Sequence, residues 1–156
     1  MAKLLFVCLG NICRSPAAQA VMEQLLRQQN ITGHVCDSAG TSSFHEGQLA
    51  DERMREAASR RGMAITHRSR PITKRDLTEF DYIFVMDESN AANVFRLASS
   101  AAEKAKIKLM AAYCQQHQVK SIPDPYYGGA QGFDRVLDLL TDAASEILRR
   151  LQNGSL

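Results

Sequence analysis

One stretch near the start of the chain, FVCLGNICRSPAAQA at residues 6–20, brings together residue types that can do chemistry. An apolar run ends at Cys8, and Arg14 follows in a C-x5-R spacing with Gly10 and Asn11 between them. A loop between a strand and a helix presents unpaired backbone N–H groups at the positive end of the helix dipole, which attracts anions. An arginine fork binds two oxygens of a phosphate, and the same positive field stabilises a thiolate. The stretch therefore predicts that Cys8 is a sulfur nucleophile that faces a phosphate and attacks phosphorus.

The C-x5-R spacing alone is short, and it is also compatible with a buried structural cysteine and a solvated arginine. Three features of its context favour the functional interpretation: the strand pattern before the loop, the Gly-Asn pair within it, and Ser15–Pro16 followed by a helix pattern. A Walker phosphate loop is a poorer match, because G-x-x-x-x-G-K-[ST] does not occur in the chain.

Phosphoryl transfer to a thiolate also requires a proton donor for the departing alkoxide or phenoxide. The segment PDPYYGG at residues 123–129 is the best candidate, because Asp124 lies between two prolines that restrict the backbone and remove N–H donors. Tyr126 and Tyr127 follow it and are suited to flank an aromatic substrate. Taken in isolation, the segment is better explained as a surface turn that its aspartate caps.

The fold must hold these residues in place, and the chain alternates strand-like and helix-like segments. Short apolar runs are typical of strands covered on both faces, and they predict strands at 3–8, 34–41 and 80–87. Residues at helical spacing predict a helix at 16–29, and the clearest amphipathic pattern predicts a helix from Phe133 to Leu151. The polar stretch at 49–62 is expected to be a helix that stops at Gly62, and Ser89 is expected to start another. Ser15 is the expected N-cap of the first helix, and Asn30 is its expected end.

The segment KAKIKLMAAY at 104–113 is ambiguous, because its alanines and lysines favour a helix while Ala105, Ile107 and Leu109 alternate as in a strand. The whole pattern, βαβαβα(β)α, predicts a single α/β domain over residues 1–156 with a parallel sheet. Ligands of such sheets bind beyond the carboxyl ends of the strands, which is where Cys8 is expected to lie.

The composition is that of an ordinary globular chain. Its 156 residues suit one domain, and its 19 Lys and Arg are scattered rather than arranged in the basic stripe of a nucleic-acid binder. No apolar run is long enough to span a membrane, and the apolar N-terminal stretch is too short for a signal peptide, so a cytoplasmic protein is expected. The four cysteines are expected to be free thiols, and the dispersed histidines predict no metal site.

Taken together, VCLGNICRSP at 7–16 and DPYYG at 124–128 closely resemble the low-molecular-weight protein tyrosine phosphatase family. The resemblance extends to DSAGT (37–41), HRSRPIT (67–73) and FDYIFVMDESN (80–90). It implies a four-stranded parallel sheet flanked by helices on both faces, with KIKLM as the fourth strand and a phosphate-binding loop between the first strand and the first helix. It also implies hydrolysis of phosphotyrosine through a phosphocysteine intermediate, with no metal and no organic cofactor.

The resemblance assigns roles to individual residues. Cys8 is the nucleophile, Arg14 holds the phosphoryl oxygens, and Asp124 protonates the leaving phenol and then serves as the base for water. The phosphate-binding loop comprises Leu9, Gly10, Asn11, Ile12, Cys13, Arg14 and Ser15, and Ser15 donates a hydrogen bond to the Cys8 sulfur. A supporting network is formed by Asn11, Ser15, Ser38 and His67. The walls of the substrate cleft are Ile12, Phe44, Tyr126 and Tyr127.

Cys13 has no part in this chemistry, yet it lies five residues after Cys8 in a loop that curls around a phosphate. An accessible thiolate is readily oxidised to a sulfenic acid, which condenses with a neighbouring thiol to a disulfide. Cys13 is therefore predicted to be a redox partner of Cys8, a role that the resemblance also favours. The alternative is that Cys13 only fills space beneath the loop.

Three rival functions fit the same loop. An arsenate reductase of this fold uses a pair of downstream cysteines, but 80–90 has none and Cys114 stands alone. A protein-arginine phosphatase carries threonine at the position of Ile12, whose apolar side chain favours a phenyl ring. A non-catalytic phosphate-binding module has no use for Asp124. The expected partners are thus phosphotyrosine-containing proteins or small aryl phosphates, with inorganic phosphate as product, and neither nucleic acid nor membrane.

Overall fold

A four-stranded parallel sheet is the centre of the molecule in the computed structural model, which describes all residues, 1–156. The strand order is β2-β1-β3-β4, in which β1 spans Lys3–Cys8, β2 Val35–Gly40, β3 Tyr82–Val85 and β4 Ile107–Leu109. β1 therefore pairs on both edges, and its last residue, Cys8, is in register with Gly40 of β2. The predicted parallel sheet is confirmed, and the ambiguous segment at 104–113 contributes β4.

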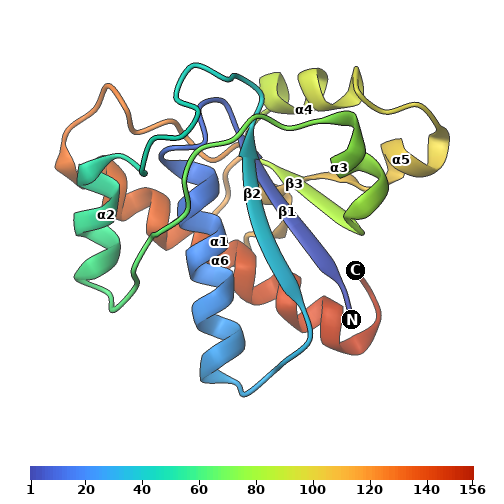
Figure 1. Cartoon of the computed structure of the whole chain (residues 1–156). Helices are drawn as coiled ribbons and strands as arrows, with labels where there is room; N and C mark the ends of the chain where they lie inside the picture. Colours follow the sequence, from blue (N-terminus) through green and yellow to red (C-terminus); the bar gives the residue numbers. More distant parts are fainter.

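Helices cover both faces of the sheet (Figure 1). On one side lie α1 (Arg14–Gln28), α2 (Glu52–Ser59) and α6 (Ala130–Asn153). On the other side lie α3 (Lys74–Glu79), α4 (Glu88–Phe95) and α5 (Ala101–Ala105). A short 3-10 helix, η1 (Met110–Tyr113), follows β4. No helix combines the length and the apolarity that crossing a bilayer requires.

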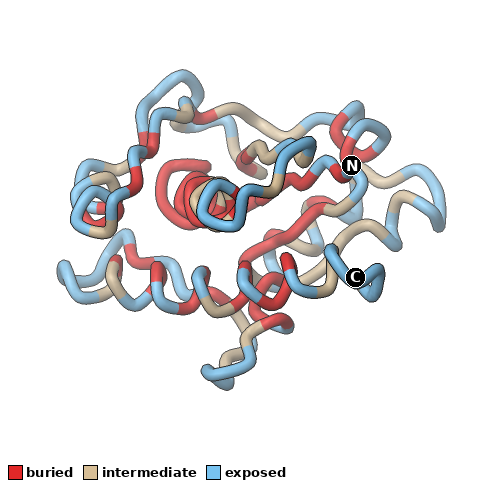
Figure 2. Tube along the Cα trace, turned by 90° about the horizontal axis from the view of Figure 1, so that it is seen from below, coloured by how far each residue is buried: buried red, intermediate tan, exposed pale blue.

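The side chains of β1 explain why this strand is an uninterrupted apolar run. Leu4, Phe6 and Cys8 pack into the larger hydrophobic core beneath α1 and α6, whereas Leu5 and Val7 pack into the smaller core beneath α3 and α4. Because both faces are covered, neither set of alternate positions meets water. Figure 2 shows the buried segments running through the middle of the trace, with exposed segments around them. Cys8 is thereby fixed at the end of the most enclosed strand.

The first helix begins earlier than predicted. α1 starts at Arg14 with Cys13 at the N-cap position, so the prediction that Ser15 is the N-cap was wrong. The Ser15 side chain points instead into the loop, where it contacts the Cys8 sulfur. The end of the helix was predicted correctly, because Asn30 follows the C-cap in a left-handed conformation with φ of 55°.

Other helix boundaries also differ from the prediction. α2 is shorter than 49–62, because Asp51 caps its first turn and the chain leaves the helix before Gly62, where φ is +80°. α4 begins at Glu88, with Asp87 rather than Ser89 at its N-terminus. The short helices α3 and α5 were not predicted, since six and five residues are too few to show an apolar periodicity.

Candidate active site

In the turn between β1 and α1, carbonyl groups are hydrogen-bonded to the surrounding protein while the backbone N–H groups are not. The carbonyl oxygens of Leu9, Gly10 and Ile12 accept hydrogen bonds from the Ser42 N–H, the Ser69 hydroxyl and the Asp51 N–H, at 2.8–2.9 Å. None of the backbone N–H groups from residue 9 to residue 14 donates a hydrogen bond within the protein. Six donors at a helix N-terminus form a site for a tetrahedral anion.

The side chain of Asn11 holds this turn in shape. Its backbone is left-handed, with φ of 54°, a conformation that asparagine tolerates better than most residues. Its Oδ1 accepts hydrogen bonds from the Arg70 N–H at 3.0 Å and from His67 Nε2 at 2.8 Å. Its Nδ2 donates to the hydroxyls of Ser15 at 2.7 Å and Ser38 at 3.1 Å. All four hydrogen-bonding positions of the buried amide are therefore used, as a buried polar group requires.

Ser15 is the one residue of this network that touches the sulfur. Its Oγ lies 3.0 Å from Cys8 Sγ, and it accepts the hydrogen bond from Asn11 Nδ2. The hydroxyl proton of Ser15 is thus available to the sulfur, because the next acceptor, the Ala39 carbonyl, is more distant at 3.4 Å. A hydrogen bond from a hydroxyl to a thiolate is charge-assisted and stronger than one between neutral groups.

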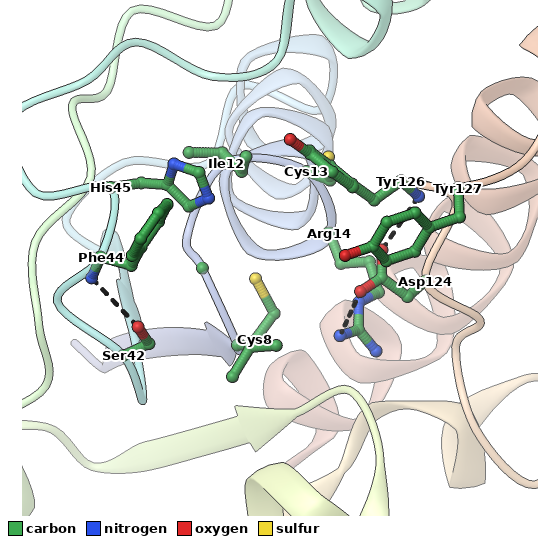
Figure 3. Close-up of a pocket in the computed structure, with 12 residues that line it drawn as sticks. Cys8, Ile12, Cys13, Arg14, Ser42, Phe44, His45, Asp124, Tyr126 and Tyr127 are labelled. Carbon is green, nitrogen blue, oxygen red and sulfur yellow. Dashed lines mark hydrogen bonds and ion pairs between the residues drawn. The ribbon is translucent and has the colours of Figure 1, made fainter.

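Arg14 is buried, and one end of its guanidinium is occupied by the protein itself. Nη1 donates to Asp87 Oδ2 at 2.8 Å and to the Ile122 carbonyl at 3.0 Å. Nη2 lies 3.6 Å from Asp124 Oδ2, at the pocket side of the group (Figure 3). Fixing one nitrogen aims the rest of the planar group toward the space above Cys8.

Asp124 lies on an exposed turn that reaches over the loop. Its side chain is 42% exposed, and its Oδ1 accepts a hydrogen bond from the Tyr126 N–H at 3.0 Å. Figure 3 shows its carboxylate between the Arg14 guanidinium and the ring of Tyr127, on the opposite side of the pocket from Phe44. The structure therefore brings Asp124, more than one hundred residues further along the chain, to the same pocket as Cys8 and Arg14.

The pocket is a cavity of about 380 Å³ whose floor and rim differ in exposure. Cys8 at the floor is 3% exposed, whereas Phe44 and Tyr127 at the rim are 82% and 93% exposed. The four side chains expected to form the cleft walls, Ile12, Phe44, Tyr126 and Tyr127, all line this cavity. A ligand must therefore reach through an apolar and aromatic passage to meet the sulfur.

None of the four expected supporting residues, Asn11, Ser15, Ser38 and His67, lines the pocket. Ser38 and His67 come from other parts of the chain and lie behind the loop. Ser38 donates its hydroxyl hydrogen to Gln19 Oε1 at 2.8 Å, and His67 is joined to the loop by its hydrogen bond with Asn11. Burial lowers the pKa of His67, although Asp37 Oδ1, 3.5 Å from its Nδ1, favours the charged form. A neutral His67 with its proton on Nε2 suits the carbonyl oxygen of the Asn11 amide.

Cys13 lines the same pocket as Cys8 but differs from it in surroundings. Both are free and buried. Burial is the main cause that raises the pKa of the Cys13 thiol, and the nearby Asp51 carboxylate adds to it. Cys13 is therefore a neutral thiol at ordinary pH and no competitor for phosphorus.

Several side chains that the sequence did not single out belong to this region. Asp87, which holds Arg14, also accepts a hydrogen bond from the Asn90 N–H and so caps α4. Its place at the carboxyl end of a predicted strand was the available signal, because ligand sites gather there. His45 and Ser42 line the pocket from a loop with no recognisable pattern. The His45 ring packs so closely on Gly10 that a Cβ at that glycine would lie 3.0 Å from Cδ2.

The potential metal-ligating side chains of the chain are dispersed. The structure gathers no group of three His, Cys, Asp or Glu side chains in a metal-binding arrangement. Within the pocket, the Arg14 guanidinium and the unpaired backbone N–H groups of the loop are available to bind an anion.

Comparison with known proteins places this geometry in a family. Residues 3–155 match the family model described as low molecular weight phosphotyrosine protein phosphatase. A human low molecular weight phosphotyrosine protein phosphatase is 45% identical over 135 residues, which is 85% of each chain. A protein tyrosine phosphatase from Entamoeba histolytica superposes with a TM-score of 0.97 at 46% identity over both whole chains. A Drosophila arginine phosphatase superposes with a TM-score of 0.91 at 31% identity over 97% of this chain and 98% of its own. The chain belongs to the low molecular weight phosphotyrosine protein phosphatase family.

Proposed function

We propose that this protein hydrolyses phosphotyrosine in proteins, or small aryl phosphates, in two steps through a phosphocysteine on Cys8. The observation that carries the proposal is the position of Cys8 Sγ. It lies 3.0 Å from the Ser15 hydroxyl, at the floor of a pocket that Arg14, Asp124 and the inward-facing N–H groups of residues 9–14 surround. A nucleophile, an oxyanion site and a proton donor are thus present together.

In the first step the Cys8 thiolate attacks phosphorus, and the bond between phosphorus and the phenolic oxygen breaks. Asp124, in its acid form, gives its proton to that oxygen, so a neutral phenol leaves. The loop N–H groups and Arg14 bind the three remaining phosphoryl oxygens throughout. These donors are already oriented before the substrate arrives, so little reorganisation is needed during the reaction.

In the second step water attacks the phosphocysteine, and Asp124, now a carboxylate, accepts a proton from it. Inorganic phosphate is released, and the electron pair of the sulfur–phosphorus bond returns to Cys8 as a thiolate. The Ser15 hydroxyl, 3.0 Å from Sγ, stabilises that thiolate as the leaving group. Asn11 keeps Ser15 oriented for this contact.

The depth of the pocket favours an aryl phosphate as the substrate. Cys8 is buried at the floor, and the rim is formed by exposed aromatic side chains. Phosphotyrosine is longer than phosphoserine, so it is better suited to bring phosphorus to the buried sulfur while its ring lies against Ile12, Phe44 and Tyr126. Offset or edge-to-face aromatic contacts add to the apolar area that the ring buries.

The proposal also covers the extent of the domain and the role of the second pocket cysteine, Cys13. Residues 1–156 act as one phosphatase domain, and Cys13 protects Cys8 by forming a reversible disulfide after oxidation. The arsenate reductase alternative lacks support, because Cys36 and Cys114, the other two cysteines, do not line the pocket.

The test is hydrolysis of matched phosphotyrosine, phosphoserine and phosphoarginine peptides by the native protein in a metal chelator. Fast turnover of the phosphotyrosine peptide alone is expected. Acid-quenched protein is expected to carry one phosphoryl group, mapped to Cys8 by mass spectrometry. Dependence on added metal, preference for the phosphoarginine peptide, or a phosphoryl group on another residue would each overturn the proposal.

A further inference from the structure

The segment Pro123–Gly128, which carries Asp124 and is called the acid segment below, has few attachments to the rest of the molecule. Two of its hydrogen bonds are internal, from the Tyr126 N–H to Asp124 and from the Gly128 N–H to the Pro125 carbonyl. One hydrogen bond joins it to another part of the chain: Arg53 Nη2 donates to the Tyr126 carbonyl at 3.0 Å. Asp124 also has its 3.6 Å ion pair with Arg14, the residue that must bind phosphate.

Arg53 is itself held in one orientation. Its Nε and Nη2 donate to the two carboxylate oxygens of Asp51, at 3.1 Å and 2.9 Å. The second hydrogen on Nη2 is then directed at the Tyr126 carbonyl. The guanidinium lies over the ring of Tyr126, 5.4 Å from its centroid, and over that of Phe133, at 4.7 Å. A planar group that is paired in two places and stacked on two rings has little freedom to rotate.

Asp51, the partner of Arg53, is itself bonded to the phosphate-binding loop. The Asp51 N–H donates to the Ile12 carbonyl at 2.8 Å, and the Asp51 side chain caps the first turn of α2. A continuous set of contacts thus runs from Ile12 through Asp51 and Arg53 to the Tyr126 carbonyl, two residues from Asp124. In Figure 1 the chain before α6 comes close to the N-terminal end of α2, where these residues lie.

We propose that Arg53 is a positioning residue for Asp124. By joining the Tyr126 carbonyl to Asp51, it holds the acid segment at a set distance from the phosphate-binding loop while the phenol receives its proton. This inference rests on the proposed function, because it assumes that Asp124 is the acid. Arg53 does not line the pocket, so it acts through the segment and not on the substrate.

The experiment is Arg53→Met, which keeps an apolar stem against the two rings and removes every donor. The kcat/KM for phenyl phosphate is expected to fall about tenfold, because a misplaced acid transfers its proton less efficiently to a leaving group that needs one. The kcat/KM for 2,4-dinitrophenyl phosphate, whose leaving group needs no proton, is expected to stay within about twofold. Inhibition by inorganic phosphate is expected to be unchanged, because the phosphate-binding loop remains intact.

Two further variants separate positioning from general structure. Arg53→Lys retains the charge but not the planar fork, so it is expected to recover only part of the phenyl phosphate activity. Arg60→Met, at the other end of α2, is the matched control: its ion pair with Asp134, at 3.7 Å, is exposed and worth little, so native kinetics are expected. Equal slowing of both substrates by Arg53→Met, or no slowing of either, would show that Arg53 does not act on the acid.

A double-mutant cycle decides whether the effect passes through Asp124. In an Asp124→Asn background, Arg53→Met is expected to change kcat/KM for phenyl phosphate by less than about twofold, because no acid is left to position. A full tenfold loss in that background would overturn the inference while leaving the proposed function intact. Failure of the proposed function has a different signature: the native protein itself would show no dependence on Asp124 across leaving groups.

Discussion

The two parts of the pocket are built in opposite ways. Around Cys8 the loop is buried except at Leu9 and Gly10. The carbonyls of Leu9, Gly10 and Ile12 are hydrogen-bonded to the surrounding protein, and the Asn11 amide makes four hydrogen bonds. The acid segment is exposed apart from Pro125, and one hydrogen bond, from Arg53, joins it to the rest of the chain. Both are short connections that follow a strand or precede a helix, so the difference lies in their contacts and not in their place in the fold.

The difference corresponds to two tasks. Phosphoryl oxygens are stabilised by donors that do not move, which calls for a rigid loop. An aromatic substrate must enter past Asp124 and leave again, which calls for a segment that opens at low cost. On the proposed mechanism, changes in the rigid part remove chemistry or its anion site, whereas changes in the exposed part alter one proton transfer.

The most damaging change to the rigid part is Cys8→Ser. Turnover of phosphotyrosine is expected to fall by about 10⁴-fold or more, because a hydroxyl in this site is a far poorer nucleophile than a thiolate. Binding of vanadate or phosphate, measured by calorimetry, is expected to persist, since the loop N–H groups and Arg14 remain. Substantial residual turnover would remove Cys8 from the nucleophile's role.

The corresponding change in the exposed part is Asp124→Asn. The kcat/KM for phenyl phosphate is expected to fall by roughly 10²–10³-fold, within the range for loss of a general acid. The kcat/KM of this variant for 2,4-dinitrophenyl phosphate is expected to be much closer to the native value. A steady-state assay across a series of substituted phenols measures this, and uniform slowing across the series contradicts the assignment.

Ser15→Ala tests whether the network behind the sulfur serves the second step. Losing a hydrogen bond to a charged group is expected to slow hydrolysis of the phosphocysteine by about 10–100-fold. A stopped-flow burst of phenol is expected to remain, followed by a slower steady state. Loss of the burst together with the steady-state rate would place Ser15 in the first step instead.

Cys13→Ser leaves the rigid loop nearly intact, so its activity before oxidation is expected to be close to native. After peroxide treatment, dithiothreitol is expected to restore the native protein but not the variant, because Cys8 then has no neighbouring thiol to stop further oxidation. Phosphate in the pocket is expected to slow inactivation of both. Equal recovery of the two proteins would show that Cys13 only fills space.

The smallest expected effect is a pH dependence of stability. Burial lowers the pKa of His67 below its ordinary 6.5, so the unfolded chain binds this proton more readily than the folded one. The free energy of unfolding therefore falls as pH drops below 6.5, with a slope of at most about 1.4 kcal/mol per pH unit for one group. His67→Gln is expected to remove this part of the slope in denaturant titrations, and an identical pH dependence in both proteins would contradict it.

The sequence predicted the sheet well because burial on both faces leaves a local signature. The run at 3–8 is β1 without adjustment, and the periodic residues between Phe133 and Leu151 lie within α6. The N-cap prediction failed at Ser15. Serine is favoured at helix N-termini, but that preference does not show whether its hydroxyl caps the helix or, as here, contacts the Cys8 sulfur. Arg53 carried no pattern of its own, and the signal at Asp87 was its place at the end of a predicted strand. The contacts of both residues are with partners more than seventy residues away in the chain.

Position 11 has a consequence for mutational tolerance. Glycine adopts the left-handed backbone of Asn11 but has no side chain, and aspartate offers the acceptors that Arg70 and His67 use but no donors for the two serines. No other residue type meets both demands in the space of asparagine. In a saturation library selected for activity, position 11 should therefore be almost uniform. Leu9, two residues earlier and half exposed, serves the same loop through its backbone and should accept many replacements.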